Sequence, residues 1–424
     1  MITSQCILGG PMKVVGIIAE YNPFHNGHKY QIEELKKQTG ADYCIIAMSG
    51  NFLQRGTPAI CNKYERTRMA LSCGADLVLE IPNLWATASA ELFAKGGVTL
   101  LAKTGVVTHL GFGAETDDLE LLKKISSILK EEPENYSLAL RKSLRQGNSY
   151  PLARKEALLS ILPEVDKTYL EDILSSPNNI LALEYLKALP DNITPVLVQR
   201  KGANYHDTEL QTDLPSASAI RQAVFSTPSK NTETALQSAM PAEAYDILKE
   251  CISRNAILDT NDLSEIMGYR LMSLPKYELF QYSDCSPELA NTIKNNLASF
   301  QDLESFYQTI KSKNYTHTRI SRALLHILLG IKDFHVTHGR QDDYITYLRV
   351  LGFRKDASDL LSVIKKEAQA PLITKVADYT SYFRGHTDEM MEQDIHASAI
   401  YQQLMTTRKG QPVTNDYTSQ IVIL

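Results

Sequence analysis

Short apolar runs alternate with amphipathic stretches over the first 115 residues of the chain. The strand-like runs, rich in Val and Ile, span residues 13–19, 43–48, 76–81 and 106–113. Helical patterns fill the gaps at residues 29–37, 62–73 and 89–101. Apolar runs without polar alternation are typical of strands that are buried on both faces. Strands that alternate with helices predict a parallel sheet covered by helices, which is a Rossmann-like α/β fold.

The pattern becomes mostly helical after residue 115. Residues 115–175 are helical and charged, Pro195–Val198 reads as a further strand, and a helix starts at Ser216. Beyond about residue 240 we expect almost only helices, such as the amphipathic run Ile320–Leu329. A chain of 424 residues is too long for one core. We therefore expect an α/β domain over residues 1–240 and a mostly α-helical domain over residues 241–424.

Charge and cysteine content exclude few functions. The net charge of −5 gives no global basic field, although a local basic patch can still bind RNA. None of the six cysteines forms a C-x-x-C pair or has zinc spacing, which favours a reducing cytoplasm and no metal site. No run approaches the roughly 20 apolar residues of a membrane span. Residues 1–11 lack the features of a signal peptide, and Met12 is a candidate start.

The loop after the first strand carries the strongest chemical signal. It reads Ile18-Ala19-Glu20-Tyr21-Asn22-Pro23-Phe24-His25-Asn26-Gly27-His28 and is followed by Lys29. It is predicted to lie at the carboxyl edge of the sheet, where ligands bind, and free N–H groups at a helix start suit a phosphate. Gly27 would let the backbone approach that phosphate closely. His25 and His28, one turn apart, can donate to phosphate oxygens as charge grows on them in a transition state. Exposed turn histidines are the alternative interpretation.

A second helix start has the same character. Ser216-Ala217-Ser218-Ala219-Ile220-Arg221 places serine hydroxyls at a helix N-terminus and an arginine one turn on. Ser216, Ser218 and Arg221 are candidate phosphate ligands, and we assign catalysis to His25, His28 and Arg221. A capping serine followed by a surface arginine is the alternative.

Other strand ends add candidates. Ser49, Gly50, Asn51, Gln54 and Arg55 follow the second strand and suit a small carboxylate substrate. Gly113 ends the fourth strand, where adenine or ribose could pack on the backbone, and Arg200 follows the fifth. Plain surface loops are the alternative. We expect Lys63, Arg66 and Arg68 to form a solvated helix face.

Taken together, these motifs resemble those of the bacterial tRNA(Met) cytidine acetate ligases. The H-x-G-H segment at His25–His28 is shared across the nucleotidyltransferase superfamily, including class I aminoacyl-tRNA synthetases and pantetheine-phosphate adenylyltransferase. The segments that match the family are Glu20–His28, Met48–Gly56, Pro177–Ile180, Ser216–Arg221, Tyr315–Arg319 and Leu351–Phe353. They extend over nearly the whole chain from Met12.

The resemblance implies a two-step reaction. ATP first reacts with acetate to give acetyl-adenylate and pyrophosphate, and N4 of the wobble cytidine of elongator tRNA(Met) then attacks. ATP is a substrate that carries its own Mg²⁺, so no protein metal ligand is expected. The implied ATP contacts are Ile18 to Lys29, Gly113, Asn178 or Asn179, Arg200, Ser216, Ser218 and Arg221.

The helical half is expected to bind the tRNA. Lys311, Lys313, Arg319 and Arg322 cluster with Tyr315, and interleaved basic and aromatic residues suit RNA. A solvated helix end is the alternative for these residues. For the whole chain, a small-metabolite adenylyltransferase of the same superfamily and a non-catalytic RNA-binding protein remain alternatives. The sequence assigns no oligomeric state.

Overall fold

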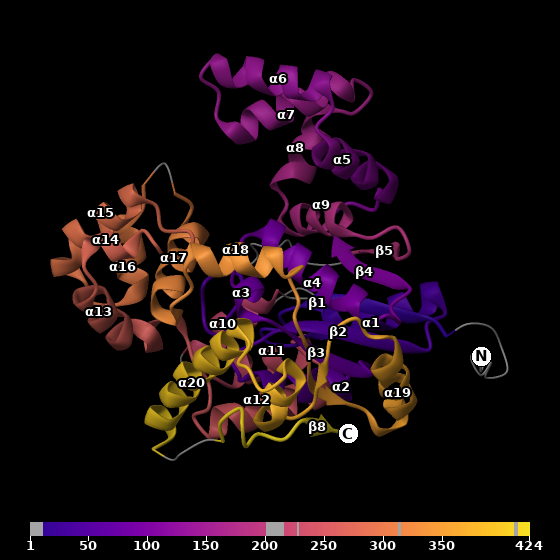
Figure 1. Cartoon of the computed structure of the whole chain (residues 1–424), viewed down its shortest axis with the longest axis vertical. Coiled ribbons are helices and arrows are strands. Elements are labelled where there is room, and N and C mark those ends of the chain that lie inside the picture. Colours follow the sequence, from indigo (N-terminus) through magenta and orange to yellow (C-terminus); the bar gives the residue numbers. More distant parts are fainter. Residues whose placement is uncertain (1–11, 201–215, 227–228, 313–314, 411–413) are drawn as a thin grey trace.

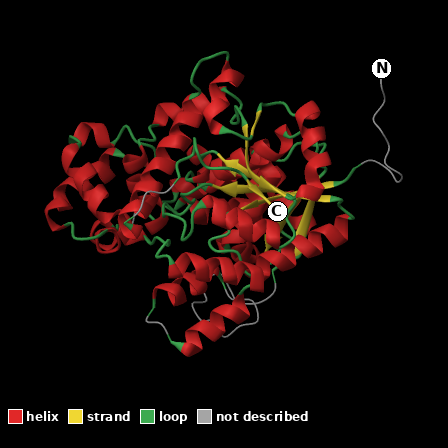
Figure 2. Cartoon of the chain, turned by 90° about the horizontal axis from the view of Figure 1, so that it is seen from below, coloured by secondary structure: helices red, strands yellow, loops and turns green. Residues whose placement is uncertain are grey.

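A mixed sheet lies at the centre of the molecule (Figures 1 and 2). The computed structural model describes residues 12–200, 216–226, 229–312, 315–410 and 414–424. Within them the strands are β1 (Val14–Ala19), β2 (Tyr43–Ser49), β3 (Leu77–Ile81), β4 (His109–Ala114), β5 (Thr194–Gln199), β6 (Leu348–Phe353), β7 (Leu372–Ile373) and β8 (Val422–Ile423). Their order is β5-β4-β1-β2-β3-β6-β7, with β8 beside β6.

The first five strands are parallel, as the sequence predicts. Successive residues of β1 pack into different cores: Val14 lies with Ile45 on one face, and Val15 lies with Ile46 on the other. This two-sided burial explains the unbroken apolar run. β4 begins three residues later than expected, at His109, and Val106 and Val107 are buried in the preceding loop.

Helices α1 (Asn26–Thr39), α2 (Lys63–Ser72), α3 (Asn83–Ala86) and α4 (Ala90–Lys103) connect the first four strands. The helical segment before β5 comprises α5 (Leu119–Glu131), α6 (Glu134–Arg145), α7 (Tyr150–Ile161), α8 (Lys167–Ser175) and α9 (Pro177–Ala188). Figure 1 shows α5 to α8 extending away from the sheet, while α9 lies close to it. Buried side chains of α4 and α9, such as Phe93 and Leu183, belong to one apolar core.

After β5, the elements that the structure describes are helices, apart from three strands. The helices are α10 (Ala217–Phe225), α11 (Lys230–Ala239), α12 (Ala242–Ser253), α13 (Ser264–Ser273), α14 (Lys276–Leu279), α15 (Pro287–Asn296), α16 (Leu303–Ile310), α17 (His317–Leu329), α18 (Asp333–Gln341), α19 (Ser358–Glu367) and α20 (Glu389–Lys409). Figure 1 shows α13 to α17 grouped beside the sheet. The sequence predicts almost only helices here and does not identify the strands β6, β7 and β8, of which β6 pairs antiparallel with β3 and the other two pair with β6. The division at residue 240 stays a prediction.

A buried ionic cluster attaches these late strands to the sheet. The Lys63 ammonium lies 2.9 Å from both Glu80 Oε1 and Asp416 Oδ2, and Arg349 Nη1 lies 3.0 Å from Glu80 Oε2 and Asp416 Oδ2. The solvated face expected for Lys63 and Arg66 is therefore wrong, because both side chains are fully buried. Pairing with carboxylates makes the burial of Lys63 and Arg349 tolerable.

Candidate active site

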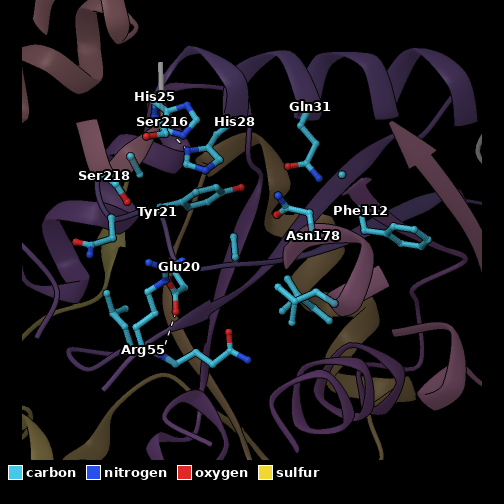
Figure 3. Close-up of a pocket in the computed structure, with 18 of the residues that line it drawn as sticks. Glu20, Tyr21, His25, His28, Gln31, Arg55, Phe112, Asn178, Ser216 and Ser218 are labelled. Carbon is cyan, nitrogen blue, oxygen red and sulfur yellow. Dashed lines mark hydrogen bonds between the residues drawn. The ribbon is translucent and has the colours of Figure 1, made fainter. Parts of the chain in front are cut away.

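The predicted strand-end loops meet around one pocket (Figure 3). The β1–α1 loop contributes Glu20, Tyr21, Asn22, His25 and His28, and other strand and helix ends contribute the rest. The lining residues from the sequence prediction are Ile18, Ala19, Glu20, Tyr21, Asn22, His25, His28, Gln54, Arg55, Gly113, Asn178, Arg200, Ser216, Ser218 and Arg221. Ligand crevices of parallel sheets form at this edge.

His25 and His28 cap the helix whose start they occupy. The His25 ring accepts a hydrogen bond at Nδ1 from the Gly27 N–H (3.1 Å), and His28 Nδ1 accepts one from the His25 N–H (3.2 Å). The two rings stack with centroids 3.7 Å apart. A ring nitrogen that accepts carries no proton, so both protons sit on Nε2. Each ring therefore keeps one N–H donor for a ligand.

Both histidines are neutral at physiological pH. Burial, with smaller contributions from the nearby Arg200 and Arg221, lowers the pKa of His25 to about 3. Burial also lowers the pKa of His28 well below its ordinary value, with His25 and Arg200 as smaller causes. The sequence predicts free backbone N–H donors at this helix start, and for His25 and Gly27 that prediction is wrong. Each of their N–H groups donates to an imidazole Nδ1.

Gly27 makes room for a neighbouring side chain. A Cβ at this position would lie 2.9 Å from Cε1 of His25, so only glycine leaves space for the His25 ring. Of the other loop residues, Pro23, Phe24, Asn26 and Lys29 do not line the pocket. Phe24 belongs to the core, and Asn26 Nδ2 donates to Ser238 O (2.7 Å).

Tyr21 offers a further donor. Its backbone lies in the left-handed region, with φ of 49°, which is unusual for a residue that is not glycine. Its ring contacts both Phe24 and His28. The buried hydroxyl has no hydrogen-bond partner within the described part of the chain. Figure 3 shows it pointing towards the side of the pocket that Asn178 occupies.

The loop after β2 divides into buried and pocket-lining residues. Gln54 and Arg55 line the pocket, and the Gln54 N–H donates to Glu20 Oε1 (2.9 Å). Ser49, Gly50 and Asn51 do not line it. Asn51 Oδ1 instead accepts a hydrogen bond from the Lys63 N–H (2.9 Å). Of the five expected substrate ligands, Gln54 and Arg55 therefore line this pocket, and the role of the other three stays a prediction.

Arg66 joins two of the pocket loops through hydrogen bonds to their backbone. Its guanidinium donates to the carbonyl oxygens of Glu20 (2.6 Å) and Ser49 (3.1 Å), and also to those of Gly50 and Cys61. One rigid fork thus connects the ends of β1 and β2. The sequence pattern of α2 gave no sign of this role.

Arg221 and the serines lie as predicted at the start of α10. Ser216 Oγ caps the helix by accepting from the Ala219 N–H (3.1 Å). The Arg221 guanidinium donates to Asn22 O (2.7 Å) and to Ser218 Oγ (3.0 Å). Burial lowers the pKa of Arg221 to about 10, so it is charged at neutral pH. With Arg55 and Arg200, it makes the pocket suited to an anion.

The structure separates the two asparagines that the sequence left open. Asn178 lines the pocket and donates from Nδ2 to Glu115 Oε1 (2.7 Å). Asn179 is buried, and its Oδ1 accepts from the N–H groups of Glu115 (2.9 Å) and Thr116 (3.2 Å). Gln31 and Tyr185 also line the pocket and were missed. Helical spacing was the available signal, since Gln31 follows His28 by three residues.

The predicted RNA patch on α17 is partly neutralised. Arg322 donates to Asp284 from Nε (2.8 Å) and Nη2 (3.4 Å), and the Arg319 guanidinium lies 5.1 Å from the centre of the Tyr315 ring. Lys311 is exposed, and Lys313 lies outside the described residues. The role of this patch stays a prediction.

Comparisons with known proteins agree with this geometry. The family model described as HIGH Nucleotidyl Transferase matches residues 12–416. The chain is 38% identical to the tRNA(Met) cytidine acetate ligase of Clostridium perfringens, over 97% of this chain and 100% of that protein. The ligase of the same name from a Thermoanaerobacter species is 40% identical, over 92% and 95% of the two chains.

The chain belongs to the tRNA(Met) cytidine acetate ligase family. Solved structures show the same relationship. TmcAL of Thermotoga maritima in its apo form superposes with a TM-score of 0.90 at 29% identity, covering 97% of this chain and all of the other. The same enzyme bound with alpha-thio ATP superposes with a TM-score of 0.88. In the part of the chain that the structure describes, no helix has the length and apolar character needed to cross a membrane.

Proposed function

We propose that this protein joins acetate to N4 of the wobble cytidine of elongator tRNA(Met) at the expense of ATP. The names of its relatives support this function, as does the ATP analogue bound to the T. maritima enzyme. In the first step an acetate oxygen attacks the α-phosphorus, and the bond to the bridging oxygen breaks to release pyrophosphate. In the second step N4 attacks the acetyl carbon of the mixed anhydride, AMP leaves, and the amine gives a proton to water. We place this reaction in the cytoplasm.

The pair of neutral histidines is the observation that carries the proposal. Both residues line the pocket, and their Nε2–H groups can only donate, because Nδ1 is engaged with the backbone. Such donors stabilise the charge that develops on α-phosphate oxygens, and they act mainly in the transition state. A general base would need a free acceptor, which neither ring offers.

The remaining pocket residues divide between ATP and acetate. We assign Arg221 and Arg200 to the phosphates and the Asn178 side of the pocket to adenosine, since all three residues line it. Arg55 and Gln54, next to Glu20, are the candidates for holding the acetate carboxylate. Magnesium enters with the phosphates of ATP, and we assign it no protein ligand.

Exchange of labelled pyrophosphate into ATP tests the proposal. We expect exchange that depends on acetate and does not need tRNA, followed by transfer of labelled acetate to tRNA(Met) when that RNA is added. Exchange that is indifferent to acetate and instead depends on a phosphorylated metabolite would favour a small-metabolite adenylyltransferase. No exchange under any condition would favour a non-catalytic RNA-binding protein.

A further inference from the structure

A second cavity lies on the opposite side of α4 and α9 from the pocket described above. Its volume is about 590 Å³, within the range of ligand sites. Leu92 and Lys95 of α4 line it, whereas Phe93 lines the first pocket. Glu184 of α9 lines it, whereas Tyr185 lines the first pocket. The two cavities are thus about one helix diameter apart, roughly 10 Å. Residues of α5, α6 and α7 line the cavity together with those of this helix pair.

Three cations around this cavity have no carboxylate partner among the described residues. They are Lys95, Lys130 and Arg154, whereas Lys187 pairs with Glu184 at 2.7 Å. The Nε atom of Arg154 is buried and makes no hydrogen bond within the described chain. A buried guanidinium donor without a partner is costly in an empty site, and a phosphate oxygen would satisfy it.

Aromatic rings complete the lining. Tyr344 has a left-handed backbone, with φ of 64°, and so does Asp343 before it, with φ of 53°. Trp85 holds it there, since Trp85 Nε1 donates to Tyr344 O (2.5 Å) and the rings lie 5.0 Å apart. The Lys95 ammonium lies 5.6 Å from the centre of the Tyr344 ring. Tyr150 also lines the cavity and is 56% exposed, so its ring is open to stacking.

We propose that this cavity binds one nucleotide of the tRNA other than the wobble cytidine. The inference rests on the proposed function, because that function supplies the RNA. Arg154 and Lys130 contact the phosphate, a base stacks on Tyr150 or Tyr344, and the carboxylates of Glu91 and Glu132 accept from base amino groups. The mixture of cations and carboxylates suits a single nucleotide better than an extended phosphate track. It also supplies positive charge that Arg322, paired with Asp284, cannot offer.

Charge reversal tests the site. The variant carries Arg154→Glu and Lys130→Glu, and the matched control carries Arg141→Glu and Lys142→Glu, two exposed cations of α6 that do not line the cavity. We expect at least a tenfold loss of tRNA(Met) affinity in the first variant and little change in the control. The slope of log affinity against log salt should fall by about 0.7 for each lost phosphate contact. Tyr150→Ala, at an exposed position, should weaken binding without changing the salt slope.

Three readouts separate the outcomes. Acetate-dependent pyrophosphate exchange should be unchanged in all variants, because the first pocket is intact. Calorimetric titration with CMP, with the first pocket saturated by an ATP analogue, tests a free nucleotide as the occupant. Loss of CMP binding with normal tRNA affinity would overturn the RNA assignment, and normal binding of both would overturn the site. Absence of acetate-dependent exchange in the wild type would refute the proposed function alone.

Discussion

Gly56, next to the proposed acetate ligand Arg55, lets the loop after β2 rest directly on the backbone of α17, and Gly56→Ala tests that contact. Its φ is +77°, in the left-handed region. An added Cβ would lie 2.5 Å from Arg322 N and 2.7 Å from Ser321 O. These are backbone atoms, so no side-chain rotation relieves the overlap. Ser321 Oγ also donates to Gly56 O (2.9 Å), which holds the loop to the helix.

The expected cost has two parts. The left-handed conformation costs an L-residue about 1–2 kcal/mol. Overpacking against fixed backbone costs about 1–3 kcal/mol more. The loop relieves part of this by moving, and the neighbouring Arg55 then moves in the pocket. A displacement of about 1 Å can reduce a rate by roughly 100-fold. We therefore expect both a less stable protein and a large fall in kcat/KM for acetate.

Gly147→Ala provides the matched control. Gly147 also has a positive φ, of 85°, but no heavy atom lies within 4 Å of the Cβ position. In denaturant unfolding, Gly147→Ala should lower the free energy of unfolding only by the cost of the left-handed conformation. Gly56→Ala should lower it by more, because the overpacking cost is added. Acetate titrations of pyrophosphate exchange should be normal in the control. Equal stabilities and equal acetate dependence in the two variants would refute the argument from packing.

Three further changes probe the site. His28→Ala should slow acetate-dependent exchange by about 10²–10³, the scale of one oxyanion donor, and near wild-type turnover would exclude the role. Arg66→Lys should destabilise the protein by about 2–6 kcal/mol in denaturant unfolding, because at least two buried carbonyl groups lose their donor. An unchanged free energy of unfolding would show that Arg66 does not hold the two loops together. His25→Asn keeps a capping acceptor but removes a group that takes up a proton on unfolding. As pH falls from 6.5 towards 3, wild-type stability should decline relative to this variant by up to about 1.4 kcal/mol per pH unit, and parallel pH profiles would show that His25 is not held neutral.

The sequence predicts the first four strands well because their apolar runs are largely buried, and it also finds β5, an edge strand that is only partly buried. β6 was missed for a physical reason. Its run Leu348–Phe353 includes Arg349, and a charged residue argues against a central strand. Only the tertiary structure brings Arg349 to Glu80 and Asp416, which make its burial tolerable. The same missing partners led to the expectation that Lys63 was solvated.

The position of the site was predictable, but the role of each polar residue was less so. Strand order places the ends of β1, β2, β4 and β5 at one edge, so the loops that meet there follow from topology. Asn178 and Asn179 show where the reasoning ends. An asparagine side chain can bind a ligand or cap backbone groups. Asn178 lines the pocket, whereas Asn179, the next residue of α9, accepts hydrogen bonds from the loop before α5. Sequence spacing alone does not decide between them.

In the proposed mechanism, the histidine pair connects folding directly with catalysis. Because each Nδ1 accepts a backbone N–H at the start of α1, the fold itself places the proton on Nε2. Burial and the neighbouring arginines then prevent a second protonation. The donors are thus ready before ATP binds, which is the preorganisation that transition-state stabilisation requires. The helix start pairs best with neutral rings, because an imidazolium Nδ1 would present a proton to the backbone N–H. A change that frees either Nδ1 should therefore weaken the helix cap and raise the pKa of that ring together.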